Sequence, residues 1–73
     1  MMDFTVLVRP AREGGYWTEV PALPGCYSQG ETIEEALANT KEAIECHAAA
    51  LREDGQEVGA DTGLVIGRVT VGA

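Results

Sequence analysis

The sequence has few of the residues that build catalytic, metal or disulfide sites. Among its 73 residues are two cysteines and one histidine, with no CxxC or HxxxH spacing. Two cysteines are too few for a disulfide scaffold, so we expect Cys26 and Cys46 to be free thiols. No metal site and no cofactor site is predicted, because clustered ligand residues are missing.

Basic residues and long apolar runs are also scarce. Five basic residues stand against 12 acidic ones, for a net charge of −7. This balance argues against direct nucleic-acid binding, which uses clustered Lys and Arg to neutralise phosphates. No apolar run approaches the roughly 20 residues that cross a bilayer, and no signal peptide precedes the first strand-like residues. We therefore expect a cytoplasmic protein without membrane contact, whose acids keep it soluble or suit a basic partner.

The length of the chain predicts one domain over residues 1–73, with a thin core. Small domains usually form two layers, so a sheet here would have one face covered by helix. The other face must then be polar, or be buried by a second copy or by a partner.

Three strands are predicted in the first half of the chain. Met2–Pro10 alternates apolar residues on both faces, and Tyr16–Val20 is rich in aromatic and β-branched residues. The pair Gly14 and Gly15 between them suits the positive φ angles of a hairpin turn. Cys26–Gln29 is predicted as a short third strand.

A junction of prolines, glycines and a helix-start signal follows the hairpin. Pro21 and Pro24 lack backbone donors, so with Gly25 they predict a rigid turn or bulge. Thr32 and Glu35 form a capping box, in which the Thr32 hydroxyl accepts from the Glu35 N–H and the Glu35 side chain returns a bond to Thr32. The helix is therefore expected to begin at Thr32.

The helix and a last strand complete the predicted fold. Apolar residues recur at helical spacing up to Gly55, the expected residue after the helix end. The stripe consists of Ile33, Leu37, Thr40, Ile44, His47 and Leu51, widened by Ala36, Ala43 and Ala48. Leu64–Val71 alternates as a strand. The element order is β-β-β-α-β, which predicts an α+β fold with a three-stranded antiparallel start and one helix packed on the sheet.

Nucleophilic catalysis has little support in these residues. Cys26 follows Gly25 in a turn, but a thiol needs a paired base, and the only histidine is His47. We expect His47 to pack beside the apolar stripe through a hydrogen bond.

The junction and its neighbours carry a resemblance to a known family. The motifs are Gly15-Tyr16-Trp17, Val20-Pro21-Ala22-Leu23-Pro24-Gly25-Cys26 and Gln29-Gly30-Glu31-Thr32-Ile33-Glu34-Glu35-Ala36. Joined in this order, they resemble the HicB-like antitoxins, whose amino-terminal domain is described as a partial RNase H fold. The resemblance covers about Phe4 to Gly55. It implies an intracellular protein that blocks a small basic mRNA-cleaving toxin of the HicA type by covering its RNA-binding and catalytic face.

Two features of the family are not expected in this chain. HicB antitoxins commonly continue into a carboxy-terminal DNA-binding segment, whereas nothing basic or helical follows Val71, so operator binding is not predicted. The RNase H likeness also suggests a metal nuclease, which needs several carboxylates gathered around divalent metal. Asp3, Glu19 and the helix acids show no such convergence, so we expect a binding module and not an enzyme.

The candidate partner-binding residues are large or charged side chains on strands: Trp17, Glu19, Tyr27 and Arg68. Trp17 and Tyr27 would be the anchors, although Trp17 has the alternative role of packing over the sheet. We expect a homo-oligomer formed through the uncovered sheet face or a strand edge. The alternative function is an orphan, self-associating regulatory domain without a toxin partner.

Overall fold

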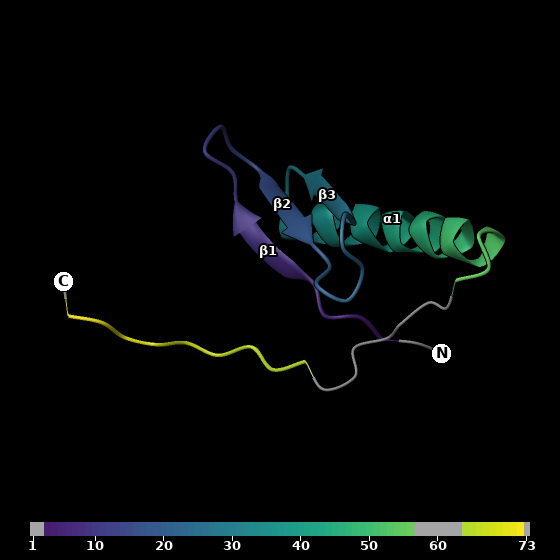
Figure 1. Cartoon of the computed structure of the whole chain (residues 1–73). Coiled ribbons are helices and arrows are strands. Elements are labelled where there is room, and N and C mark those ends of the chain that lie inside the picture. Colours follow the sequence, from purple (N-terminus) through teal and green to yellow (C-terminus); the bar gives the residue numbers. More distant parts are fainter. Residues whose placement is uncertain (1–2, 57–63, 73) are drawn as a thin grey trace.

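A helix crosses one face of a small antiparallel sheet in the computed structural model, which describes residues 3–56 and 64–72. The elements are β1 (Leu7–Pro10), β2 (Tyr16–Glu19), β3 (Tyr27–Gly30) and α1 (Ile33–Glu53). The strand order is β1-β2-β3, and both neighbouring pairs are antiparallel. Figure 1 shows α1 lying along one side of the three strands. This confirms the predicted α+β class with a three-stranded antiparallel start followed by one helix.

The β1–β2 hairpin turns through the two predicted glycines. Gly14 has φ 102° and Gly15 has φ 73°, which are conformations that other L-residues rarely adopt. The turn is closed by hydrogen bonds from the Ala11 N–H to the Gly15 carbonyl at 2.9 Å and from the Gly14 N–H to the Ala11 carbonyl at 3.2 Å. The local glycine pair therefore sets the register of the two strands.

All three strands have different bounds from those predicted, and β2 ends at Glu19 and not at Val20. β1 spans Leu7–Pro10 and not Met2–Pro10, because its partner β2 ends at Glu19, which pairs with Leu7. Residues 3–6 precede this pairing and are not part of a strand. β3 covers Tyr27–Gly30, one residue later than predicted, because the Cys26 N–H bonds to the Leu23 carbonyl within the preceding turn. Met2 lies outside the described residues.

Close approach of β3 to α1 depends on a glycine. A Cβ at Gly30 would meet the backbone of Ala36, with the Ala36 Cα at 2.8 Å and the Ala36 N closer still. Ala36 itself is fully buried. The Asn39 side-chain amide donates to the Gln29 carbonyl at 2.8 Å and ties the helix to the same strand. Small residues therefore let the helix rest almost directly on the β3 backbone.

A buried pair of threonines joins the sheet to the helix. Thr18 and Thr40 are 0 % and 1 % exposed, and their hydroxyl oxygens lie 2.6 Å apart. The Thr40 hydroxyl donates to the Ala36 carbonyl at 2.6 Å, which uses its one proton. The Thr18 hydroxyl must then donate to Thr40. Every polar group in this chain of bonds is satisfied, as burial demands.

The buried side of α1 is narrower than the predicted stripe. Its buried residues are Ala36, Thr40 and Ala48, while Ile33 and Leu37 are 44 % and 42 % exposed. The prediction was wrong for these two large residues. Because α1 lies so close to β3, only small side chains fit between them, and the larger ones lie at the margin of the contact.

The helix ends as predicted just before Gly55: its last residue is Glu53, Asp54 is the C-cap and Gly55 is the residue that follows the cap. This residue has φ 75°, and its N–H bonds to the Arg52 carbonyl at 3.0 Å. The Gln56 N–H bonds to the Leu51 carbonyl at 2.8 Å. These two bonds form a Schellman motif, which satisfies carbonyls that the helix leaves without partners.

The predicted last strand, Leu64–Val71, is not formed in this single chain. Residues 64–72 have no strand assignment, and every one of them is exposed. Figure 1 shows this part of the chain running outside the sheet. Alternation supplies only the tendency to form a strand, which also needs a hydrogen-bonded neighbour and a covered face. The connection predicted over Gln56–Gly63 lies, beyond Gln56, outside the described residues.

Candidate functional site

The sheet face opposite α1 gathers the largest exposed side chains of the strands. The register places Leu7, Glu19 and Tyr27 side by side, and likewise Arg9, Trp17 and Gln29. Successive side chains of a strand point to opposite faces. Because Thr18 points to the helix, Trp17 and Glu19 must point away from it. We call the group Arg9, Trp17, Glu19, Tyr27 and Gln29 the outer sheet patch.

Contacts within the outer sheet patch hold an arginine over the tryptophan. The Arg9 guanidinium carbon lies 4.9 Å from the centre of the Trp17 ring, in cation–π geometry. The Arg9 Nη2 also lies 3.6 Å from the Glu19 Oε1. These side chains are 52 % and 33 % exposed, so the ion pair adds little stability. Its effect is to orient the guanidinium across the ring.

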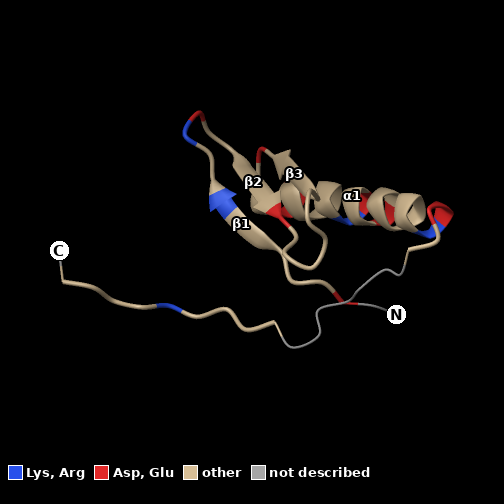
Figure 2. Ribbon diagram, viewed as in Figure 1, with Lys and Arg blue, Asp and Glu red and all other residues tan. Residues whose placement is uncertain are grey.

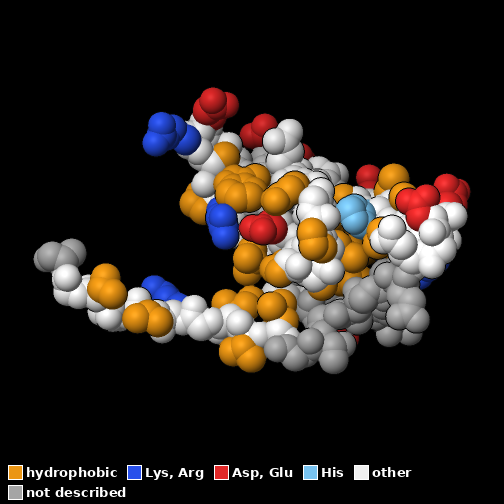
Figure 3. All heavy atoms as spheres, in the orientation of Figure 1, with side chains coloured by type: hydrophobic (Ala, Val, Ile, Leu, Met, Phe, Trp, Pro, Cys, Tyr) orange, Lys and Arg blue, Asp and Glu red, His pale blue; other side chains and the backbone are white. Residues whose placement is uncertain are grey.

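Beside this group, Tyr27 stands out into solvent. It is 57 % exposed, and a shallow hollow of about 410 Å³ is lined by Trp17, Tyr27, Ser28 and Gln29. Figure 3 shows hydrophobic side chains gathered over the strands on this face, with basic and acidic groups next to them. A flat aromatic surface edged by charge has the composition of a protein contact surface.

Three of the four predicted partner-binding residues thus lie together. Trp17, Glu19 and Tyr27 belong to the outer sheet patch, whereas Arg68 is exposed in the segment 64–72 and takes no part in it. Arg9 was missed by sequence reasoning. The available signal was the hairpin: its glycine turn pairs Arg9 with Trp17, which puts both on one face.

The proline-bounded turn supplies the core of the domain. Val20, Leu23 and Cys26 are 1 %, 2 % and 3 % exposed and form one buried cluster. Within the turn, the Leu23 N–H bonds to the Val20 carbonyl and the Cys26 N–H to the Leu23 carbonyl, each at 3.0 Å. Pro21 is half-buried and Pro24 is exposed.

Gly25 and Thr32 take the local conformations that the junction needs. Gly25 has φ 87°, which fits a turn residue. The Glu35 N–H donates to the Thr32 hydroxyl at 3.1 Å, which confirms Thr32 as the N-cap. The second bond of the capping box differs from the prediction: the Glu35 carboxylate accepts from the Glu31 N–H at 3.2 Å, and not from Thr32. One more residue is therefore tied to the helix start.

The thiol in this junction is structural. Burial raises the pKa of Cys26, so it stays protonated at neutral pH and is a poor nucleophile. Cys46, on α1, is exposed. Across residues 3–56 and 64–72, no group of three or more His, Cys, Asp or Glu side chains is placed to hold a metal ion.

Acidic side chains are distributed widely over the domain. Figure 2 shows them along α1, at its carboxy-terminal end and in the turns around the strands, with fewer basic groups between them. The first turn of α1 carries Glu34 and Glu35, where the helix dipole favours negative charge. Within the described ranges, no helix is both long and apolar enough to cross a membrane.

The fold is a two-layer α+β domain whose outer sheet face carries aromatic side chains that are partly or largely exposed. Known proteins share this fold. The family described as HicB_like antitoxin of bacterial toxin-antitoxin system matches residues 4–66. The chain belongs to this family.

Relatives of similar length support the assignment. The chain is 42 % identical over 60 residues to the UPF0150 protein Ta0767 of Thermoplasma acidophilum, covering 82 % of this chain and 87 % of the relative. It is 45 % identical over 56 residues to the UPF0150 protein ssr1765 of Synechocystis, covering 77 % and 71 %.

Solved structures of an antitoxin share both fold and sequence. The crystal structure of the Burkholderia pseudomallei antitoxin HicB matches with a TM-score of 0.73 and 41 % identity, over 85 % of this chain and 48 % of that one. The structure of its N-terminal domain matches with a TM-score of 0.69 and 38 % identity, over 84 % and 70 %. The matched part of this chain thus spans about half the length of that HicB chain.

Proposed function

We propose that the protein is an antitoxin that binds and neutralises a small, basic, mRNA-cleaving toxin of the HicA type. In this proposal it covers the RNA-binding and catalytic face of the toxin. Membership of an antitoxin family supports a role in a toxin–antitoxin system and suggests a non-enzymatic role. The identity of the toxin and the manner of neutralisation are the parts we propose.

The observation that carries the proposal is the outer sheet patch. α1 packs on one side of β2 and β3, and within residues 3–56 and 64–72 no other helix or strand covers the opposite face, so a partner could bind there. That face holds Trp17 and Tyr27, and aromatic side chains of this kind contribute much of the binding energy in protein interfaces. Glu19 adds an acidic group beside them. A partner with a basic, RNA-binding surface would complement it.

The net charge of the chain supports the same partner. A charge of −7 attracts a basic protein over long range and raises the rate of encounter. The same charge repels RNA and DNA, so the proposed mode of action is contact with the toxin and not with nucleic acid. We place this action in the cytoplasm, where mRNA is the toxin's substrate. No cofactor or enzymatic step is part of the proposal.

Self-association is a second part of the proposal. The domain is small, has exposed apolar side chains and leaves both edges of its sheet, β1 and β3, without a further strand partner among the described residues. A homo-oligomer would cover part of this surface. We therefore propose that the antitoxin acts as a homo-oligomer.

The decisive experiment measures binding to the small basic protein encoded next to this chain's gene. We expect tight binding by the wild type and loss of the toxin's RNA cleavage in the complex. Tyr27→Ala should weaken binding by about 2 kcal/mol, or about 30-fold in Kd, because it removes an exposed anchor. Titration calorimetry and an RNA-cleavage assay measure the two effects.

A matched control tests whether the loss belongs to the patch. Ile33→Ala removes an apolar side chain of similar exposure, 44 %, from the start of α1. It should leave binding unchanged. Equal losses from the two substitutions would remove the outer sheet patch from the proposal, and failure of the wild type to bind the toxin would refute the antitoxin function.

The alternative function is an orphan domain that self-associates without a toxin. It is favoured by the exposed apolar residues of the segment 64–72, which suit contact with another copy irrespective of any toxin. An oligomer that neither binds the neighbouring protein nor inhibits it would support this alternative. The metal-dependent nuclease suggested by RNase H likeness predicts cleavage of RNA or DNA with added magnesium or manganese, which we do not expect.

A further inference from the structure

A basic side chain of this acidic protein lies on the very surface that we propose for a basic partner. Arg9 stands on β1 directly opposite Trp17, and its guanidinium carbon is 4.9 Å from the centre of that ring. Its Nη2 faces the Oε1 of Glu19. An aromatic ring beside a carboxylate is a suitable site for a guanidinium group. The outer sheet patch therefore already holds a cation that belongs to its own chain.

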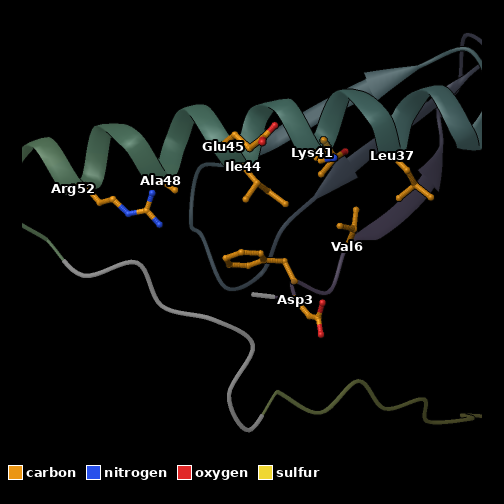
Figure 4. A pocket seen from close by; sticks show the side chains of 10 residues that line it. Asp3, Val6, Leu37, Lys41, Ile44, Glu45, Ala48 and Arg52 are labelled. Atoms are coloured by element: carbon orange, nitrogen blue, oxygen red, sulfur yellow. The ribbon is translucent and has the colours of Figure 1, made fainter. Parts of the chain in front are cut away.

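Two other basic side chains lie in a different place. Lys41 and Arg52 line a groove of about 660 Å³ between α1 and the residues that lead into β1, together with Asp3 and Glu45. Figure 4 shows both of them extending from α1. The groove also touches the buried Thr40, so it lies on the helix side of the sheet. Arg52 therefore offers a comparison, because its charge can be removed without touching the outer sheet patch.

The contact between Arg9 and Glu19 is incomplete. Their nearest atoms are 3.6 Å apart, whereas a guanidinium and a carboxylate that share a hydrogen bond lie at about 2.8 Å. The register explains this distance: Arg9 is paired with Trp17, and Glu19 with Leu7, so the arginine must reach diagonally across the two strands. The Glu19 carboxylate is thus oriented toward a cation and still able to accept stronger bonds.

An arginine from a partner is not subject to this restriction. It approaches from solvent and can place two N–H groups on the two oxygens of Glu19, the paired geometry that makes such contacts strong. Its flat guanidinium can stack on the Trp17 ring, which the ammonium of a lysine does not do. The hollow of about 410 Å³ beside Trp17 and Tyr27 gives the incoming side chain room to enter.

We propose that Arg9 is a stand-in for an arginine of the basic partner, and that this arginine replaces it over Trp17 and against Glu19 in the complex. The proposal rests on the proposed function, because it names the side chain by which the partner is recognised. Two guanidinium groups cannot share the ring and the carboxylate, so Arg9 must turn out into solvent. Arg9 therefore lowers the affinity of the patch for its partner. It also covers the ring in the free protein, where an exposed aromatic surface would attract other proteins.

The test compares two substitutions that remove the same charge. Calorimetry measures the Kd for the small basic protein encoded next to this chain's gene. Arg9→Gln should tighten binding about fivefold, because the partner no longer displaces a weakly held cation. Arg52→Gln makes the chain equally more acidic, and its Kd should stay within about twofold of wild type. Circular dichroism should show the helix signal of wild type for both variants.

A double-variant cycle tests whether the two cations compete for the same carboxylate. Glu19→Gln should weaken binding of the same basic protein about tenfold, because the partner arginine loses its charged acceptor. In the Glu19→Gln background, the gain from Arg9→Gln should fall to about twofold or less. A gain that stays at fivefold would mean that Arg9 acts elsewhere, and it would reject the competition.

A second measurement needs no toxin. Trp17 is the only tryptophan of the chain, so the indole fluorescence reports on this site alone. N-acetyl-arginine amide and N-acetyl-lysine amide are titrated into the wild type and into Arg9→Gln. We expect the arginine probe to bind Arg9→Gln several-fold more tightly than wild type, and more tightly than the lysine probe does. Equal responses to the two probes would reject a site for arginine.

The two measurements separate this inference from the proposed function. If the wild type binds the toxin but Arg9→Gln binds it no better than Arg52→Gln does, the antitoxin function stands and the stand-in role of Arg9 is wrong. Weaker binding by Arg9→Gln would show that Arg9 itself contacts the toxin, which also overturns the inference. If the wild type does not bind the toxin, the proposed function fails. The arginine probe then decides separately whether Arg9 occupies an arginine site, and no response by Arg9→Gln rejects that site.

Discussion

The two faces of the sheet differ in the size of their side chains and in how far these are exposed to solvent. The face toward α1 uses small or hydroxylated residues where the helix lies closest, such as Gly30 and Thr18, and Thr18 is fully buried there. The face away from α1 uses Trp17, Tyr27 and Arg9, which stay partly or largely exposed. One register serves both, because neighbouring residues of each strand point to opposite sides.

Within strands of four residues, the side chains of the inner face therefore serve the stability of the fold, and those of the outer face are free to serve binding. Larger side chains on the inner face would push the strand backbone away from the helix. Because the two are closely packed, such substitutions should destabilise the fold. Changes on the outer face alter contacts that end in solvent, where single interactions add little to folding. Adjacent residues such as Trp17 and Thr18 are therefore expected to give different phenotypes when substituted.

The largest effect is expected at the closest contact of the inner face. Gly30→Ala places a methyl group against the Ala36 backbone and forces strand and helix apart. We expect a loss of about 3 kcal/mol in the free energy of unfolding, measured by urea denaturation. Gly67→Ala is the control, since nothing lies within 4 Å of its added Cβ. If Gly30→Ala is as stable as this control, the inner face tolerates more space than the contact implies.

The next effect distinguishes two residues of the same hydrogen bond. Thr40→Val leaves the buried Thr18 hydroxyl without its acceptor and should cost about 2 kcal/mol. Thr18→Val removes only a donor, while Thr40 still bonds to Ala36, and should cost about 1 kcal/mol. Urea denaturation of both single variants and of the double variant measures the coupling. Equal losses from the two single variants would contradict the assigned direction of the bond.

The smallest effect is expected on the outer face. Arg9→Gln removes the cation–π contact with Trp17 and the ion pair with Glu19, and should lower stability by about 0.5 kcal/mol. Thermal unfolding at low and high salt should show that part of this difference disappears as salt screens the pair. If Arg9→Gln lowers stability as much as Gly30→Ala does, the outer face also determines stability, and the proposed difference between the two faces is wrong.

Local signals in the sequence predicted much of the fold. Gly14 and Gly15 indicated the hairpin, Thr32 indicated the helix start, and Gly55 indicated its end, because turns and caps depend on a few adjacent residues. Strand alternation also placed Trp17 and Glu19 on one shared face, and the bond from Thr18 to Thr40 of the helix identifies that face as the outer one. Those parts of the candidate site that depend on one strand and its turn were therefore accessible from the sequence.

Features that depend on distant residues were not predicted. The bond between Thr18 and Thr40 joins residues 22 positions apart, and nothing in either local pattern indicates it. Leu37 is exposed because Gly30 lets the helix lie so close to β3 that large side chains do not fit between them. The periodicity of apolar residues in the helix does not indicate this distance. The alternation of Leu64–Val71 correctly marks β-like composition, but whether a strand forms depends on the neighbour available to it.

The turn from Val20 to Cys26 has a consequence for how the chain folds. Its three buried side chains, Val20, Leu23 and Cys26, lie only three positions apart along the chain, so they can meet by closing a very short loop at small entropic cost. Ala43, Ile44 and Leu51 then pack on a cluster that already exists. We expect this turn to act as a folding nucleus, with substitutions at Leu23 slowing refolding more than they speed unfolding.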